Sequence, residues 1–219
     1  MTGSAIRAVN TNLLSGNAID VELFYQLLNL KKNMLEMSRD WMILRTFDSS
    51  ITFSASDDYT STKSLPSRFL RVYNPFSDNR QEQTGVYIVD SAGNKNALKP
   101  IKFAERYNYK DTDGFYYLDI KNNKIGRTGT LTGTLHLFFL QGTADFSIED
   151  EDTEFTTAWP FPGFAQFLLP YEIAIEQKGG IDWDRVNASQ IPFNRDTVTK
   201  IMADLAMWDA RLQQAELGV

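Results

Sequence analysis

The spacing of apolar residues predicts a helical start to the chain. From Asp20 onward, apolar residues return every three or four positions as far as Leu44, which predicts one long amphipathic helix over about 20–46 with Asp20 as its N-cap. Its solvent side is expected to hold Lys31, Lys32, Arg39 and Asp40. Residues 1–19 show no clear period and are expected to form an arm that is poorly ordered unless a partner holds it.

Apolar and polar residues then alternate, which is typical of strands. The alternation predicts a central antiparallel β-sheet or small sandwich of five to six strands. Strands are expected near 51–55 and 68–73, in hairpins over 86–98 and 115–127, and most strongly over 130–142. Asn122 and Asn123 suit the turn of the second hairpin, because asparagine tolerates a positive φ.

The most apolar stretch is WPFPGFAQFLLPYEIAIEQKGG, from Trp159 to Gly180. It predicts a helix entered through prolines and ended by two glycines. Pro170 either kinks this helix or begins a second, shorter one. A last helix is expected to begin at Asn194 or Asp196. Its apolar stripe is Val198, Ile201, Met202, Leu205, Trp208 and Leu212.

These elements indicate an α+β fold, with helices segregated from an antiparallel sheet. We expect a single α+β domain over 20–219 after the arm 1–19. Its helical part is expected to cover 20–47 and 159–217, where the long N-terminal helix and the two C-terminal helices pack as a bundle. Its β part is expected to cover 50–147.

Composition narrows the function classes. The chain contains no cysteine, so it has no disulfide and no thiolate metal site. Residues 1–140 carry 17 Lys and Arg against 14 Asp and Glu, whereas residues 141–219 carry 5 against 14. This acidic C-terminal third argues against tight, sequence-independent binding of DNA there. No stretch is apolar enough to predict a membrane span, and the N-terminus does not resemble a signal peptide.

Candidate chemistry is sparse. His136 is the only histidine, and no neighbour in sequence would orient it as a catalytic base, so we interpret it as a partly exposed strand residue. The acidic run 149–154 and the group Asp111, Asp113 and Gly114 lack the ligand spacing of a calcium loop, and a solvated loop is the simpler interpretation. We therefore expect no catalytic residue, no metal site and no cofactor.

An aromatic-rich middle leaves a sugar-binding platform open as an alternative. It consists of Tyr107, Tyr109, Phe115, Tyr116 and Tyr117. Packing within the sheet is the simpler interpretation, since tyrosine and phenylalanine are ordinary strand residues.

The order of these features resembles a family. A helix ending in RDWMILRTF is followed by TFSASDDYTSTKSLPSRFLRVY, the hairpin YYLDIKNNKIG, the strand TLTGTLHLFFLQGTADFS, the proline-led helix FPGFAQFLLPYEIAI and a closing helix. The chain resembles the head-to-tail adaptor (connector or neck) proteins of tailed bacteriophages, including podovirus tail tubular adaptors. The resemblance covers about 35–217 and is one of order and pattern.

The resemblance implies a non-enzymatic virion protein, made in the host cytoplasm and located in the neck between capsid and tail. Copies would form a dodecameric ring that docks on the portal, extends the DNA channel and offers a platform to a tail or nozzle protein. DNA would pass through without sequence-specific binding. On this hypothesis the oligomer or partner interface is expected to include Trp159, Phe161, Phe164, Leu205, Trp208 and Leu212.

Other functions remain open at this stage. The chain is also compatible with another phage head-completion, tail-completion or baseplate subunit, or with a carbohydrate-binding adhesion module. A sugar-binding module predicts tryptophan quenching by saccharides that is lost when Tyr116 or Tyr117 is changed.

Overall fold

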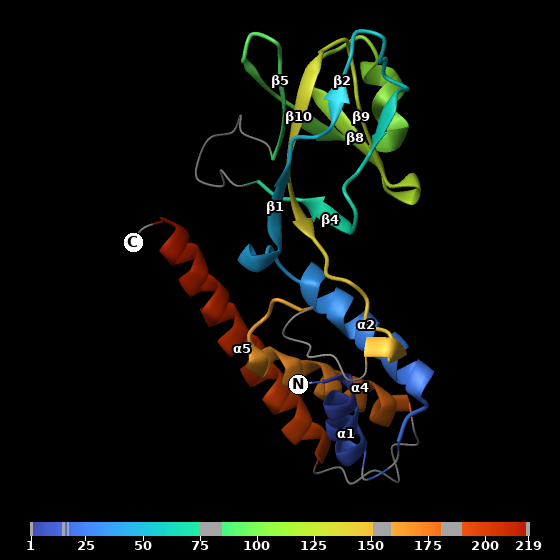
Figure 1. Cartoon of the computed structure of the whole chain (residues 1–219), viewed down its shortest axis with the longest axis vertical. Coiled ribbons are helices and arrows are strands. Elements are labelled where there is room, and N and C mark those ends of the chain that lie inside the picture. The colour runs from blue at the N-terminus through green and yellow to red at the C-terminus, as the bar shows by residue number, and fades with distance from the viewer. Residues whose placement is uncertain are drawn as a thin grey trace. The chain divides into compact units, whose positions relative to one another are not determined.

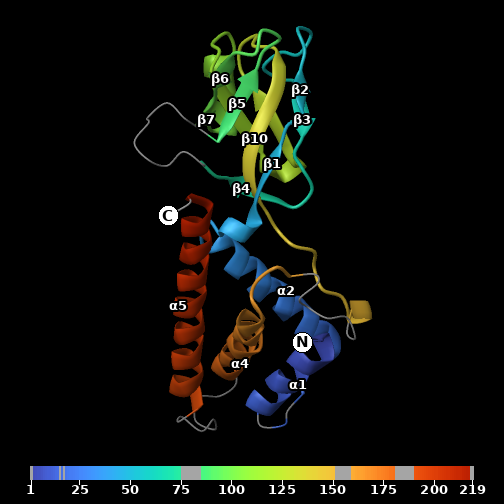
Figure 2. The ribbon, with the colours of Figure 1, turned by 60° about the vertical axis from the view of Figure 1, so that its left-hand side comes forward.

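The computed structural model describes residues 2–14, 16, 18–74, 85–150, 159–180 and 190–217, and it confirms the α+β class (Figure 1, Figure 2). The chain divides into two compact units. The helical unit combines Met1–Ile43 with Thr143–Val219, and the β unit is Leu44–Gly142. Each unit is described by itself below.

The helical unit is built around α4. Its helices are α1 (Gly3–Leu13), α2 (Val21–Met37), α4 (Leu168–Gly180) and α5 (Gln190–Leu217), with the 3₁₀ turns η4 (Ile148–Asp150) and η5 (Gly163–Phe167). Helices α1, α2 and α5 each pack against α4. The two predicted C-terminal helices are thereby confirmed.

The expectation of a poorly ordered arm over 1–19 is wrong for α1. Thr2 caps this helix, because its Oγ1 accepts a hydrogen bond from the N–H of Ala5 at 3.3 Å. Ile6 is buried, and so is the polar residue Asn10. One buried apolar side chain and one buried amide give no hydrophobic period, which is why the pattern did not reveal the helix.

Helix α2 is shorter than the predicted helix over 20–46 and ends at Met37. The carbonyl of Leu35 accepts three hydrogen bonds there: from the N–H of Ser38 at 3.0 Å, from its hydroxyl at 2.7 Å and from Trp41 Nε1 at 2.7 Å. The Trp41 ring therefore folds back over the helix end. A 3₁₀ turn, η1 (Met42–Leu44), follows before the first strand.

Pro170 was expected either to kink a helix or to begin a second, shorter one, and the structure places it at the start of a helix. This proline is the third residue of α4, which begins directly after η5. The first turn of a helix has no internal acceptor for its N–H groups, so a proline there costs no hydrogen bond. Helix α5 begins at Gln190, a few residues earlier than predicted, and Pro192 likewise lies in its first turn.

The β unit contains two sheets. The six-stranded sheet consists of β1 (Arg45–Asp48), β2 (Thr52–Phe53), β4 (Phe69–Val72), β5 (Val86–Val89), β6 (Lys95–Ala97) and β10 (Gly133–Gln141). The four-stranded sheet has the order β3 (Thr62–Ser64), β9 (Lys124–Arg127), β8 (Phe115–Asp119) and β7 (Lys99–Ile101). All pairs are antiparallel except β7 with β8. Strand β10 is central, because it pairs with β1, β2, β4 and β5.

Both predicted hairpins are present. Strands β5 and β6 meet at a turn in which Asp90 Oδ1 accepts the N–H groups of Ala92 and Asn94, each at 2.9 Å. Strands β8 and β9 meet at η3 (Ile120–Asn122), and Asn123 closes this turn with φ 52°. This left-handed conformation is the positive φ that an asparagine at this turn was expected to tolerate.

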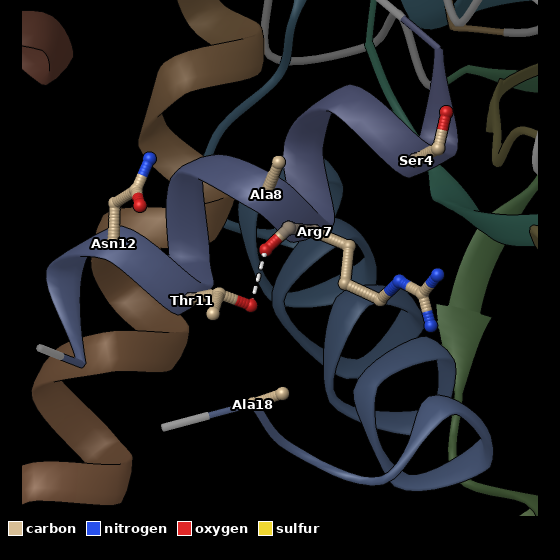
Figure 3. A pocket seen from close by; sticks show the side chains of 6 residues that line it. All are labelled: Ser4, Arg7, Ala8, Thr11, Asn12 and Ala18. Atoms are coloured by element: carbon tan, nitrogen blue, oxygen red, sulfur yellow. Dashed lines mark hydrogen bonds between the residues drawn. The ribbon is translucent and has the colours of Figure 1, made fainter. Parts of the chain in front are cut away.

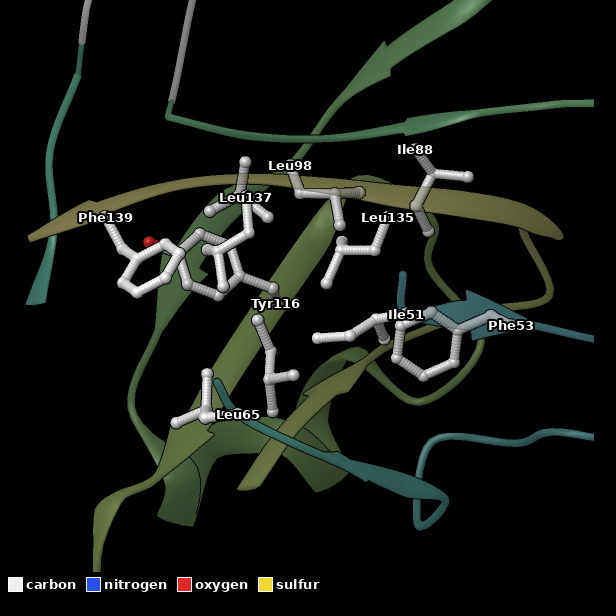
Figure 4. Close-up of a cluster of buried hydrophobic side chains, with 11 residues drawn as sticks. Ile51, Phe53, Leu65, Ile88, Leu98, Tyr116, Leu135, Leu137 and Phe139 are labelled. Carbon is white, nitrogen blue, oxygen red and sulfur yellow. The ribbon is translucent and has the colours of Figure 1, made fainter. Parts of the chain in front are cut away.

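The core of the β unit lies between the two sheets (Figure 4). Its members from β10 are Leu135, Leu137 and Phe139, which alternate along the strand and share one face. Tyr116 and Ile125 enter the core from the four-stranded sheet.

One cation is fully buried beside this core. The Arg127 guanidinium donates to the carbonyls of Gly129 and Asp57, the latter at 3.0 Å, and lies 5.3 Å from the Phe53 ring centroid. It therefore links the loop before β3 to the end of β9.

Candidate assembly surface

Helix α2 carries an apolar stripe on its outer side. The stripe consists of Leu23, Leu30, Met34 and Met37, which are 42%, 47%, 56% and 56% exposed. At 3.6 residues per turn, these four positions lie within about 60° of one another. The opposite face packs inward through Phe24, Leu28 and Leu35. Helix α2 is therefore apolar on two sides, and its own unit covers only one of them.

A buried charge cluster holds α2 to the segment that follows β10. Lys32 Nζ donates to the carbonyls of Thr143 at 3.1 Å and Ala144 at 2.9 Å, and lies 3.1 Å from Asp145 Oδ1. Glu36 accepts hydrogen bonds from the N–H and the hydroxyl of Thr143. Both Lys32 and Glu36 are fully buried. The expectation that Lys32 lies on the solvent side is therefore wrong, because its carbonyl and carboxylate partners replace water.

A second polar contact fixes α5. Asp209 is fully buried and accepts a 2.8 Å hydrogen bond from the N–H of Met42. It also lies 3.4 Å from an Arg39 nitrogen, and Gln213 donates to it at 2.8 Å. Asp209 therefore ties α5 to the segment that follows α2.

Helix α5 also has an outer side. Its exposed residues there include Ala203, Met207, Ala210 and Gln214, which recur every three or four positions, and Thr199 and Asp196 continue this side toward the N-terminus. Leu205 and Asp209 face inward instead. We call Ala203, Met207, Ala210 and Gln214 the α5 face, and the four exposed residues of α2 the α2 stripe. Both belong to the helical unit.

The residues predicted as an interface fall into two groups. Trp159, Phe161 and Leu205 are buried within the helical unit, where Phe161 stacks edge-on against Trp41 at 5.4 Å and lies 4.8 Å from Trp159. Phe164 is exposed, while Trp208 and Leu212 are half-buried. The structure thus brings Trp159 and Phe161 together as core.

Sequence reasoning missed the α2 stripe. Leu23, Leu30 and Met34 lie off the main apolar period of the helix, and a single amphipathic stripe was expected. The stripe could have been recognised from large apolar residues at helical positions that do not belong to the inward face. Leu30 and Met34, one turn apart, are such residues.

His136 is half-buried on the outer face of the six-stranded sheet, in agreement with its interpretation as a strand residue. Its ring lies 5.2 Å from that of Phe47 and 4.9 Å from that of Tyr87. Its Nδ1 is buried and has no hydrogen-bond partner among the described residues. Desolvation, with a smaller contribution from Lys95, lowers its pKa. No acid among the described residues orients the ring, so His136 forms no catalytic pair with them.

Within the candidate metal groups, Asp113 braces a turn. Asp113 Oδ1 accepts the N–H groups of Thr130 at 2.7 Å and Leu131 at 3.0 Å. Most of the acidic run 149–154 lies outside the described residues. Within the described part of the chain, no group of three acidic or histidine side chains is placed to hold a metal.

Two residues named for the sugar-binding platform, Tyr116 and Tyr117, are not accessible to a saccharide. Tyr116 and Tyr117 are buried, and the hydroxyl of Tyr117 donates to the carbonyl of Tyr59 at 2.6 Å. Burial raises the pKa of Tyr116 to about 12. Only Tyr107 of this group is strongly exposed, and the Arg106 guanidinium lies 4.6 Å from its ring centroid. A buried tyrosine offers no ring face to a saccharide.

A hollow of about 420 Å³ lies beside α1. Figure 3 shows its lining, which consists of Ser4, Arg7, Ala8, Thr11, Asn12 and Ala18. The Thr11 hydroxyl donates to the carbonyl of Arg7 at 3.0 Å, within the helix itself. None of these six side chains is a carboxylate or an imidazole, so the described lining supplies no general base.

Comparisons with known proteins do not identify the chain. No protein-family model matches it, and no curated protein sequence matches it either. Among the described helices, none is long and apolar enough to span a membrane.

Proposed function

We propose that this chain is a non-enzymatic structural component of a tailed-bacteriophage particle, a head-to-tail adaptor whose copies form a ring on the portal. The observation that carries the proposal is the α2 stripe. A helix already anchored by its inward face and by Lys32 and Glu36 still presents four large apolar side chains to solvent. Such a surface is typical of a protein that works when covered by another subunit.

The charges of the two units also suit this role. The helical unit carries 9 Lys and Arg against 18 Asp and Glu, whereas the β unit carries 13 against 10. An acidic surface repels the phosphate backbone, so DNA can slide past it without binding. The neck would thus offer a channel through which the genome passes freely.

The chemistry of the described residues supports a structural role. The buried charged groups Lys32, Glu36, Arg127 and Asp209 all hold backbone groups or partner charges of their own unit. None of them lines the hollow described beside α1. These four buried charges are therefore accounted for by folding.

Mixing the purified chain with the portal ring of its phage tests the proposal. We expect a ring-sized complex by mass measurement and a stacked ring in negative-stain images. If the chain stays monomeric at every concentration with the portal present, the adaptor function is excluded. Copy number and position in intact particles then separate an adaptor from a tail-completion or baseplate subunit.

A further inference from the structure

The helical unit presents two different exposed helix faces: the α2 stripe, which is wholly apolar, and the α5 face, which combines two alanines with Met207 and Gln214. The α2 stripe and the α5 face lie on separate helices that each pack inward against α4. A protein that pairs two unlike faces assembles head to tail, so each copy uses one face toward each of two neighbours. We propose that the α2 stripe of one copy packs on the α5 face of the next copy. The partner is thus a second copy of this chain, and the inference rests on the proposed ring.

The sizes of the side chains match. The α2 stripe presents two leucines and two methionines, whereas Ala203 and Ala210 leave the α5 face low around Met207. Large side chains from one helix fill the space left by small residues on the other, and alanine lets two helix axes approach closely. Two α2 stripes facing each other would set leucine and methionine against leucine and methionine instead.

The lengths of the two faces allow an extended contact. At 1.5 Å per residue, the α2 stripe extends about 21 Å from Leu23 to Met37. The α5 face from Ala203 to Gln214 extends about 16 Å. The α5 face can therefore lie against most of the stripe.

Charge at the edges favours the same partner. Around the α2 stripe the exposed neighbours are Gln26, Ser38 and the anionic Glu22. Along one edge of the α5 face lie two exposed cations, Lys200 and Arg211, and neither is in an ion pair with a described residue. If the two helices run parallel, Glu22 faces Lys200, because parallel helices bring opposite edges of their contact faces together.

Disulfide trapping tests the pairing cleanly because the chain contains no cysteine. Three full-length variants are needed: Leu30→Cys, Met207→Cys and, as a control, Ile148→Cys. Ile148 belongs to the same unit and is as exposed as Met207, each at 55%. Tagged and untagged chains are mixed in pairs, alone and with the portal ring, then oxidised and separated on non-reducing gels. Circular dichroism checks that each variant is folded.

We expect Leu30→Cys with Met207→Cys to form disulfide-linked dimers at least about tenfold more than either variant by itself or either mixed with Ile148→Cys, because docking raises the local thiol concentration. A chain with both substitutions should give a ladder of linked species that stops at the size of the ring. Selective linking in a preparation that forms no ring with the portal supports the pairing and contradicts the adaptor function.

Two outcomes would overturn the pairing. Strong self-linking of Leu30→Cys alone would show that two α2 stripes meet. Rings that form on the portal without selective linking of Leu30→Cys to Met207→Cys would show that another surface joins the copies, while leaving the adaptor function intact.

Discussion

Asn10 Nδ2 donates a hydrogen bond to the carbonyl of Pro170 at 3.0 Å, although 160 residues separate them along the chain. The contact is buried and joins α1 to α4. Replacing Asn10 with alanine leaves a buried carbonyl without its donor, so we expect the helical unit to lose about 1–3 kcal/mol of unfolding free energy. Urea denaturation followed by tryptophan fluorescence measures this loss, because all four tryptophans belong to the helical unit.

The matched control for this prediction is Asn12→Ala. Asn12 is exposed on the same helix, so its replacement should change the unfolding free energy by less than about 0.5 kcal/mol. Equal effects of the two substitutions would mean that the contact between Asn10 and Pro170 does not hold α1 in place.

Contacts of this kind, between residues far apart in the chain, separate the elements that were not predictable from the sequence from those that were. The hairpins and β10 were predictable, because strand alternation and turn asparagines are local signals. Helix α1 was not, since it is held by a buried amide whose partner lies in a distant helix. Lys32 was assigned to solvent for the same reason, because its partners come from residues 143–145. Trp159 and Phe161 were predicted as interface residues because they are strongly apolar, but both are buried in the core. Leu30 and Met34 were not predicted, although both are exposed.

Lys32 and its neighbour Lys31 should respond differently to the same substitution. Lys32→Met leaves Glu36 buried without its cation, which costs about 3–5 kcal/mol in comparable buried pairs. Lys31 pairs with Glu176 at 2.6 Å near solvent, so Lys31→Met should cost less than about 1 kcal/mol. Tryptophan-monitored urea unfolding compares the two variants directly. A loss of unfolding free energy below about 1 kcal/mol for Lys32→Met would contradict the conclusion that the buried charge cluster holds α2 in place.

Gly126 should not tolerate a methyl group. An added Cβ would lie 2.2 Å from Cζ of Tyr117, a buried ring whose hydroxyl is held by the carbonyl of Tyr59. Gly126→Ala is therefore expected to destabilise the β unit by about 1–3 kcal/mol through overpacking. Gly163→Ala adds a Cβ that meets nothing within 4 Å and serves as the control. Thermal unfolding followed by the amide NMR signals of the β unit reports the difference.

His136 should titrate below the ordinary histidine range. Desolvation and then Lys95 lower its pKa, so the fold prefers the neutral imidazole. As pH falls below about 6.5, the unfolded chain binds a proton before the folded chain does, and the stability of the β unit is lost through that window. NMR follows the ring protons without ambiguity, because the chain has one histidine. Lys95→Gln should raise the midpoint, whereas Lys99→Gln on the other sheet should leave it unchanged.

Leu205 and Met207 separate the core of α5 from its outer face. Leu205 is fully buried, so Leu205→Ala should cost the helical unit about 2–5 kcal/mol by leaving a cavity. Met207→Ala should change stability by less than about 0.5 kcal/mol, because its side chain is exposed. If copies assemble through the α5 face, Met207→Arg should lower ring formation on the portal while leaving urea unfolding of the monomer unchanged. Rings that form equally well with Met207→Arg would mean that this face of α5 is not covered in the assembly.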